Sequence, residues 1–254
     1  ENKNWKLIRL SRANFNYIED IFRLQNYLKK LNPDFIINCS AVTTYLECEK
    51  HSKLSFKVNS LFPLVLAKVS LKLNCKLIHF STDAVFGNHT KKLSTYKDET
   101  NPENKLGLTK LIGDLFLKKY SNTIIVRLPI LYGAHFNDSF FGKSLKSLKN
   151  NKKIYIAKDV YCSPTSAEDV AEYIKNLLKK IFMSNKINKR LIHLSSDQRV
   201  SRYEYLLDIA KKIGKERFLV GNFHRNIKSK VKPLKNMGLK CNVNDFYQKN
   251  IKIK

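Results

Sequence analysis

Glycine is scarce in this sequence: eight occur among 254 residues, and the first of them is Gly87. A dinucleotide-binding α/β fold normally opens with a strand, a glycine-rich turn and a helix whose N-terminus receives the pyrophosphate. No such turn precedes Gly87. If the chain has a fold of this kind, we expect it to lack the first βα unit.

Paired cysteines and long apolar runs are missing as well. The five cysteines form no CxxC pair and no Cys/His cluster with the spacing of a metal site, so we expect free thiols and no metal. No run of about eighteen apolar residues occurs, and no signal-peptide pattern stands at the start. These absences predict a cytoplasmic protein without a membrane span.

Acidic residues are too few to balance the basic ones, and the formal net charge is +27. Such a charge fits nucleic-acid binding or adsorption to an anionic surface. The excess is lysine, however, with 39 lysines against nine arginines, spread along the chain. Arginine is the residue suited to bidentate recognition of phosphates and bases. We therefore expect no specific nucleic-acid partner, only a mild attraction of anionic nucleotides.

Short apolar strands alternate with amphipathic helices through the first half of the chain. Strands are predicted at residues 5–10, 34–38, 77–80 and 123–127. Helices are predicted at residues 18–31, at 52–73 with a bend near Pro63, and at 104–120. Strands separated by helices of this length indicate a doubly wound parallel sheet with right-handed crossovers, an α/β fold.

The second half is less regular. Thr165 with Glu168, and Ser201 with Glu204, have the spacing of capping boxes that begin helices. Gly214 is a natural end for the second of these helices. Residues 190–194 are predicted to form a strand between the two helices.

Three motifs follow the predicted strands in order. Residues 38–43 (NCSAVT) combine small side chains that let the backbone approach a nucleotide closely. Residues 81–87 (STDAVFG) follow the next strand, and residues 102–110 (PENKLGLTK) open a helix. In that helix Lys110 lies one turn after Leu106, so both side chains share one face.

With these motifs, and with residues 127–133 (RLPILYG) and 159–165 (DVYCSPT), the chain resembles an extended short-chain dehydrogenase/reductase of the dTDP-4-dehydrorhamnose reductase type. The resemblance runs over residues 5–246. It implies a Rossmann-type doubly wound parallel sheet lacking its first βα unit, with a small C-terminal substrate lobe. Residues 1–135 would be the truncated NAD(P)-binding domain. Residues 136–254 would be the substrate-binding lobe, which returns in part to the main sheet.

The resemblance implies catalytic roles for Thr82, which would bind the substrate's keto oxygen, and for Lys110, which would bind the nicotinamide ribose. In the family, a tyrosine four residues before the lysine donates a proton to the reduced oxygen. Here Leu106 occupies that position and has no proton to give. Since general acid catalysis supplies roughly 10²–10⁴-fold, a loss of about that size is expected. Tyr45 and Tyr132 are further tyrosines, and nothing in the sequence favours either as a donor.

The resemblance also implies two sets of binding residues. The cofactor residues are Arg12, Asn38, Cys39, Ser40, Ala41, Lys110 and Pro129; the substrate residues are Thr82, Asp83, Val85, Phe86 and Asn104. Arg12 stands where an acidic residue would hold the ribose of NAD, so NADP is the expected cofactor and NAD the alternative. Either cofactor would require that the glycine-rich loop be restored.

The function implied is NADP-linked reduction of a dTDP-4-keto-6-deoxy sugar in dTDP-rhamnose and surface polysaccharide biosynthesis. The expected partners are the nucleotide-sugar substrate and either a second copy of the chain or a partner enzyme. The alternative is a non-catalytic, nucleotide-binding regulatory subunit similar to the β subunit of methionine adenosyltransferase, which residues 129–133 (PILYG) resemble. Leu106 is compatible with both the reductase and the non-catalytic subunit.

Overall fold

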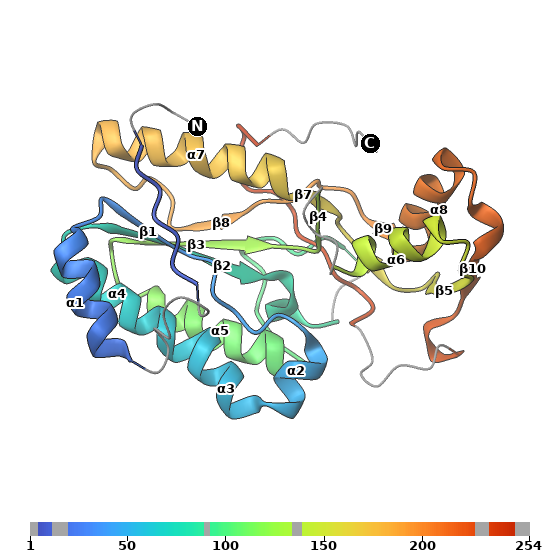
Figure 1. Ribbon diagram of the computed structural model, residues 1–254, viewed down its shortest axis with the longest axis horizontal. Helices are drawn as coiled ribbons and strands as arrows, with labels where there is room; N and C mark the ends of the chain where they lie inside the picture. The colour runs from blue at the N-terminus through green and yellow to red at the C-terminus, as the bar shows by residue number, and fades with distance from the viewer. Residues whose placement is uncertain (1–4, 12–19, 89–91, 134–138, 227–233, 247–254) are drawn as a thin grey trace.

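Four parallel strands form the central sheet of the computed structural model, which describes residues 5–11, 20–88, 92–133, 139–226 and 234–246 (Figure 1). They are β1 (Phe35–Asn38), β2 (Lys76–Thr82), β3 (Thr123–Leu128) and β8 (Leu191–His193), side by side in that order. Every residue of β3 is buried, as expected for an apolar strand in a sheet covered on both faces. The sheet confirms the predicted parallel α/β fold.

Helices cover both faces of this sheet, as a doubly wound fold requires. In Figure 1, α1 (Ile21–Leu31), α4 (Phe62–Lys72) and α5 (Lys105–Leu117) lie below the sheet and α7 (Ala167–Ser184) lies above it. Each layer has its own apolar core. Leu66 of α4 belongs to the cluster with Leu77, whereas Ile174 of α7 belongs to the cluster with Ile124 and Ile192.

The long helix predicted over residues 52–73 is broken into three parts. It consists of α3 (Ser52–Phe56), a π-helix (Lys57–Leu61) and α4, and it follows α2 (Tyr45–Lys50). Pro63 near the start of α4 has no N–H to donate, so the wider π turn directly before it has a local cause. The span Ser52–Lys72 is long and apolar enough to cross a membrane, but 56% of its most apolar window is buried inside the protein, as in a core helix.

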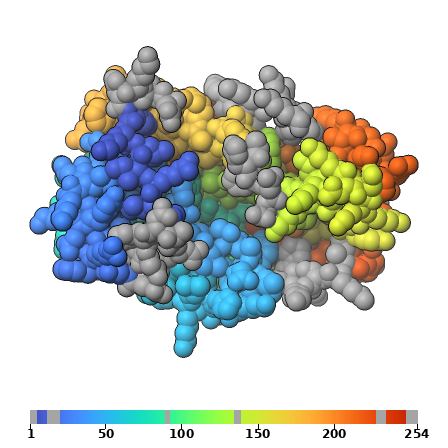
Figure 2. All heavy atoms as spheres, viewed as in Figure 1, coloured from blue at the N-terminus to red at the C-terminus, as the bar shows by residue number. Residues whose placement is uncertain are grey.

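The elements α6 (Phe140–Lys149), β5 (Ile154–Ala157), α8 (Arg202–Lys212) and β10 (Leu219–Asn222), here called the small lobe, gather at one end of the molecule (Figure 1). Strands β10 and β5 pair in parallel, and Tyr205 and Leu206 of α8 pack against Phe141 and Leu148 of α6. The space-filling view shows α6, in yellow-green, beside the orange residues of this lobe (Figure 2).

Short two-residue strands and turns complete the described chain. They are β4 (Leu131–Tyr132), β6 (Tyr161–Cys162), β7 (Thr165–Ser166) and β9 (Val200–Ser201), with 3-10 turns at Asp83–Phe86, Glu216–Phe218 and His224–Asn226. Strand β4 pairs with β7, and β6 pairs with β9.

Two local predictions need correction, and a third is confirmed. Residues 5–11 form no strand; Trp5 and Leu7 are exposed, and only Leu10 packs against the core. The first capping box is wrong by one residue, because Ser166 rather than Thr165 caps α7 by accepting from the Asp169 amide. The capping box that begins α8 is confirmed.

Candidate active site

The carboxyl ends of three neighbouring strands bring the predicted site residues to one edge of the sheet. Strand β1 ends at Asn38, β2 ends at Thr82, and β3 ends at Leu128, directly before Pro129. Because the strands are parallel and adjacent, their carboxyl ends open to the same side. In open α/β sheets this edge is where ligands bind.

Thr82 stands at the point where β2 becomes the turn Asp83–Phe86. Its hydroxyl oxygen accepts a hydrogen bond from the Ala84 amide at 3.2 Å and caps that turn. The same hydroxyl donates to Oδ1 of Asp83 at 3.1 Å. Thr82 is half-buried, whereas Asp83 is only 5% exposed. The hydroxyl is therefore fixed from both sides.

Lys110 reaches the same strand from α5. Its ammonium group donates to the carbonyl oxygen of Phe80 at 2.8 Å, two residues before Thr82 on β2. The side chain is buried, and burial lowers the pKa of Lys110 to about 8, although Asp114 opposes the shift. Leu106 is 7% exposed one turn earlier on α5 and presents no polar atom.

The turn after β1 is held by side-chain hydrogen bonds. The amide nitrogen of Asn38 lies 3.0 Å from Nδ1 of His79 on β2, and its oxygen accepts from the Ser40 backbone at 3.0 Å. His79 is fully buried, which lowers its pKa well below the usual value. The neutral imidazole therefore fixes Asn38 by a hydrogen bond without adding charge.

Asn59 in the π-helix is a positioning residue that the sequence reasoning missed. Its side chain bonds to both the N–H and the C=O of Val42, at 2.9 and 3.0 Å, and donates to the Thr109 hydroxyl at 3.1 Å. It thereby ties the turn after β1 to α5, the helix that carries Lys110. The sequence signal is only an asparagine within a long helical segment, and its burial is seen in the structure alone.

Not every predicted site residue faces this edge with its side chain. Val85 and Phe86 are 0% and 1% exposed and pack in the core with Leu111 and Leu239. Asn104 caps α5 by accepting from the Gly107 amide at 2.8 Å. The described structure thus gives these three side chains packing and capping roles.

The remaining predicted cofactor residues differ in exposure. Cys39 is exposed, Ser40 and Ala41 are half-buried, and Pro129 is buried directly after β3. Arg12 lies outside the described residues, so its predicted contact with a 2′-phosphate stays a prediction.

A buried ion pair lies beneath the site. Nε of Arg127 on β3 lies 3.0 Å from Oδ2 of Asp114, which is one turn beyond Lys110 on α5. Both side chains are almost fully buried, and the Arg127 guanidinium lies 5.0 Å from the centre of the Phe86 ring. Burial raises the pKa of Asp114, and the charge of Arg127 opposes the rise. This pair fixes α5 against the sheet.

The described residues fit one half of a nicotinamide dinucleotide. A buried ammonium on Lys110, small residues after β1 and a proline after β3 form an edge suited to a ribose and a flat ring. A pyrophosphate would need a glycine-rich turn at a helix N-terminus, and the described part of the chain before Gly87 contains no glycine. Only the ribose and nicotinamide end of the site is supplied by these residues.

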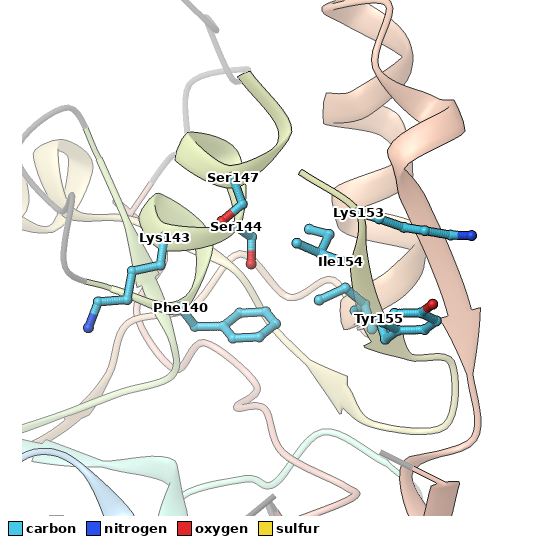
Figure 3. A pocket seen from close by; sticks show the side chains of 8 residues that line it. Phe140, Lys143, Ser144, Ser147, Lys153, Ile154 and Tyr155 are labelled. Carbon is cyan, nitrogen blue, oxygen red and sulfur yellow. The ribbon is translucent and has the colours of Figure 1, made fainter. Parts of the chain in front are cut away.

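The small lobe has a separate hollow. A cavity of about 390 Å³ lies between α6 and β5, as Figure 3 shows. Phe140, Ser144, Ser147 and Tyr155 line it, and Lys143 and Lys153 are among its remaining residues. None of the predicted site residues contributes to it. Among the described residues, no group of three His, Cys, Asp or Glu side chains is placed to hold a metal ion.

Comparison with known proteins gives a consistent result. The family model described as RmlD substrate binding domain matches residues 1–239. The spore coat polysaccharide biosynthesis protein SpsK of Bacillus subtilis is 24% identical over 213 residues, which cover 84% of this chain and 72% of the relative. The dTDP-4-dehydrorhamnose reductase of Escherichia coli is 26% identical over 74% of this chain. The match spans 63% of that relative's length.

Solved structures show the same fold. The crystal structure of a dTDP-4-dehydrorhamnose reductase from Clostridium acetobutylicum superposes with a TM-score of 0.85 at 24% identity, covering 95% of this chain and 83% of that one. The reductase of the same name from Bacillus anthracis, in complex with NADP, gives a TM-score of 0.88 at 22% identity, covering 98% and 87% of the two chains. The likeness extends through both the central sheet and the small lobe.

Proposed function

The chain belongs to the family of the RmlD substrate binding domain, and from this membership we propose that it acts on a nucleotide-linked sugar as a reductase. The proposed reaction is the NADP-linked reduction of a dTDP-4-keto-6-deoxy sugar, the step that supplies dTDP-rhamnose for surface polysaccharides. NAD is the alternative cofactor. The relatives named as dTDP-4-dehydrorhamnose reductases support the reaction class.

One observation carries the proposal. Thr82 ends β2 at the carboxyl edge of the sheet, and the Lys110 ammonium group bonds to the same strand two residues earlier, at the Phe80 carbonyl oxygen. One is a neutral donor for a carbonyl oxygen, and the other is a cation for a ribose hydroxyl. Polar side chains buried together at a ligand-binding edge are typical of a catalytic centre rather than a packing core.

The chain's own residues would bind and orient the substrate. The Thr82 hydroxyl hydrogen-bonds the keto oxygen and stabilises the charge that develops there. Lys110 holds the ribose of the cofactor and adds a positive charge close to the reacting carbonyl. The bound nicotinamide would supply the hydride. Leu106 adds apolar surface that excludes water from this side of the site.

The test is the rate of NADPH oxidation with dTDP-4-dehydrorhamnose for the protein with its glycine-rich loop restored, as cofactor binding requires. This protein, called the unaltered protein below, is compared with its Leu106→Tyr variant. A tyrosine one turn before Lys110 would add a proton donor, so we expect the variant's kcat to rise above that of the unaltered protein. Leu108→Tyr is the matched control, since residue 108 is exposed on the same helix and should leave kcat unchanged. Failure of both the unaltered protein and Leu106→Tyr to turn over would rule out the reductase.

A second function is favoured by Leu106 itself. A buried leucine where the family has a proton donor suits a non-catalytic nucleotide-binding subunit, similar to the β subunit of methionine adenosyltransferase. In that case, calorimetry would detect binding of NADPH or dTDP while neither protein turns over. The predicted homodimer or partner enzyme, the cytoplasmic location and the division at residues 135 and 136 remain proposals.

A further inference from the structure

The site contains a carboxyl group next to Thr82, that of Asp83, for which only substrate binding has been predicted and no part in the chemistry. Oδ1 of Asp83 accepts from the Thr82 hydroxyl at 3.1 Å. Oδ2 of Asp83 is buried and makes no hydrogen bond of ordinary length and angle with the described residues, although the Gly238 amide acts on the carboxyl group from nearby. A buried polar atom without a partner is costly, and its presence beside a reactive edge calls for an explanation.

The surroundings of Asp83 come from several distant segments. Arg202 at the start of α8, Tyr45 at the start of α2 and Cys162 in β6 are the titratable groups that face it, and the backbone amide of Gly238 lies nearby. Tyr45 packs against Ala84, the residue directly after Asp83. Burial raises the pKa of both Tyr45 and Cys162, so both stay neutral at pH 7. Arg202 is the one charge among the three.

Burial is the main influence on the ionisation of Asp83. Burial raises its pKa to about 7, against the opposing effects of the Thr82 hydroxyl, Arg202 and the Gly238 amide. A carboxylic acid with a pKa near the working pH is suited to general acid catalysis, which otherwise falls to histidine or tyrosine.

We propose that the Asp83 carboxyl group, acting through the Thr82 hydroxyl, supplies the proton that the missing tyrosine would have given to the reduced carbonyl oxygen. This inference rests on the proposed reductase function. It assigns Thr82 a second role, since the same hydroxyl that binds the keto oxygen also relays the proton.

The proton balance of the step is complete. The carbonyl oxygen needs one proton once its carbon has received the hydride that a bound reduced nicotinamide would supply. The Thr82 O–H bond breaks as its proton passes to that oxygen, and the Asp83 O–H bond breaks as Thr82 recovers a proton. The substrate ends as a neutral alcohol and Asp83 as a carboxylate, which Arg202 stabilises. Water returns the proton to Asp83 after the product leaves.

The hydrogen-bond direction explains why the relay requires protonated Asp83. When Asp83 is ionised, the Thr82 hydrogen points to Oδ1 and is not available to a substrate. When Asp83 is protonated, its own O–H can donate to Thr82, and the Thr82 hydrogen is free to point to the keto oxygen. The rate should therefore follow the protonated fraction of Asp83.

The first experiment measures protonation without any turnover. In protein labelled with ¹³C-aspartate, the carboxyl resonance that Asp83→Asn removes should titrate with a midpoint close to pH 7. Asp208→Asn, at an exposed site on α8, removes a different resonance and is the matched control. A midpoint near 4 for the Asp83 resonance would overturn the proposal, because the carboxyl would then hold no proton at neutral pH.

The second experiment measures kcat against pH. The unaltered protein should lose about tenfold in kcat for each pH unit above 7, and Asp83→Asn should lower kcat by roughly 10²–10⁴-fold and remove that slope. Thr82→Val should have the same effect, whereas Thr82→Ser, which keeps the hydroxyl, should retain most of the rate. Adding Leu106→Tyr to Asp83→Asn should restore turnover, which shows that the variant is folded.

The outcomes separate the two proposals. If the unaltered protein turns over and Asp83→Asn turns over equally well, the relay is wrong and the reductase stands. If the unaltered protein and Leu106→Tyr are both inactive, the reductase function fails and the relay fails with it. If Asp83→Asn is inactive and Leu106→Tyr does not rescue it, Asp83 has a structural role and the relay is again wrong.

Discussion

The buried pair between Asp114 and Arg127 should respond unequally to removal of its two members. The pair joins α5 to β3 at 3.0 Å, with the Arg127 side chain 2% exposed and the Asp114 side chain 0% exposed. Asp114→Leu leaves a guanidinium group that cannot lose its proton. Arg127→Met leaves a carboxyl group that can become neutral, since burial already raises its pKa.

The size of the effect follows from this difference. Breaking a buried ion pair by removing one partner costs about 3–5 kcal/mol, because an uncompensated charge stays buried. We expect Asp114→Leu to lower the free energy of unfolding by about that amount, and Arg127→Met by clearly less. In a chain of this length each kcal/mol shifts the Tm by about 2–4 °C, so Asp114→Leu should lower it by roughly 6–20 °C. The double variant should recover most of the loss.

Urea unfolding followed by far-UV circular dichroism at pH 7 measures all three variants. Lys175→Ala is the control, because its pair with Glu172 is exposed at 42% and 52% and should contribute about 0–1 kcal/mol. Two results would refute the reasoning: a loss below about 1 kcal/mol for Asp114→Leu, or a larger loss for Arg127→Met than for Asp114→Leu.

Two further predictions concern α5. Gly113→Ala should destabilise the fold by about 1–3 kcal/mol despite the better helix propensity of alanine, because the new Cβ would lie 2.4 Å from the Asn59 carbonyl oxygen. Thermal unfolding checks this against Gly214→Asn, where nothing lies within 4 Å and asparagine accepts the positive φ of 63°, so the Tm should barely change. Lys110→Met should show a pH-dependent difference from the unaltered protein, since the pKa of Lys110 is about 8 in the folded state and 10.5 when unfolded. The folded state disfavours the charged form, so the unaltered protein should gain about 3 kcal/mol relative to Lys110→Met as the pH rises from 8 to 10.5, and lose it as the pH falls. A difference in unfolding free energy that stays constant over that range would contradict the assigned burial.

The parts of the fold that local patterns determine were predictable. The apolar run at β3 and the amphipathic pattern of α1 are visible in the sequence, and the capping box at Ser201 and Glu204 placed the start of α8. The strand predicted at residues 5–10 was wrong because strand formation depends on a distant pairing partner and not on the local pattern alone. A strand needs a neighbour to accept its hydrogen bonds, and none of the described strands pairs with that segment.

The candidate site was predictable only in its positions along the chain. The spacing of Thr82, Leu106 and Lys110 placed the three residues, because a strand end and a helix face can be read from the sequence. Burial raises the pKa of Asp83, and Arg202 and the Gly238 amide, both more than 100 residues away in the sequence, lower it. No local pattern in the sequence shows that these distant segments come together around Asp83.

Arg202 and Cys162 belong to segments on the small-lobe side of the molecule, while Thr82 and Lys110 belong to the main sheet and the helix packed on it. Across the contact between these two parts of the structure, the charge of Arg202 lowers the pKa of Asp83, against the burial that raises it. Loosening of that contact would admit water, which lowers the pKa of Asp83, and would also withdraw the charge of Arg202, which raises it. Whenever Asp83 is ionised, the Thr82 hydroxyl points back at it, so the proton donor is available only while the effect of burial outweighs the charge of Arg202.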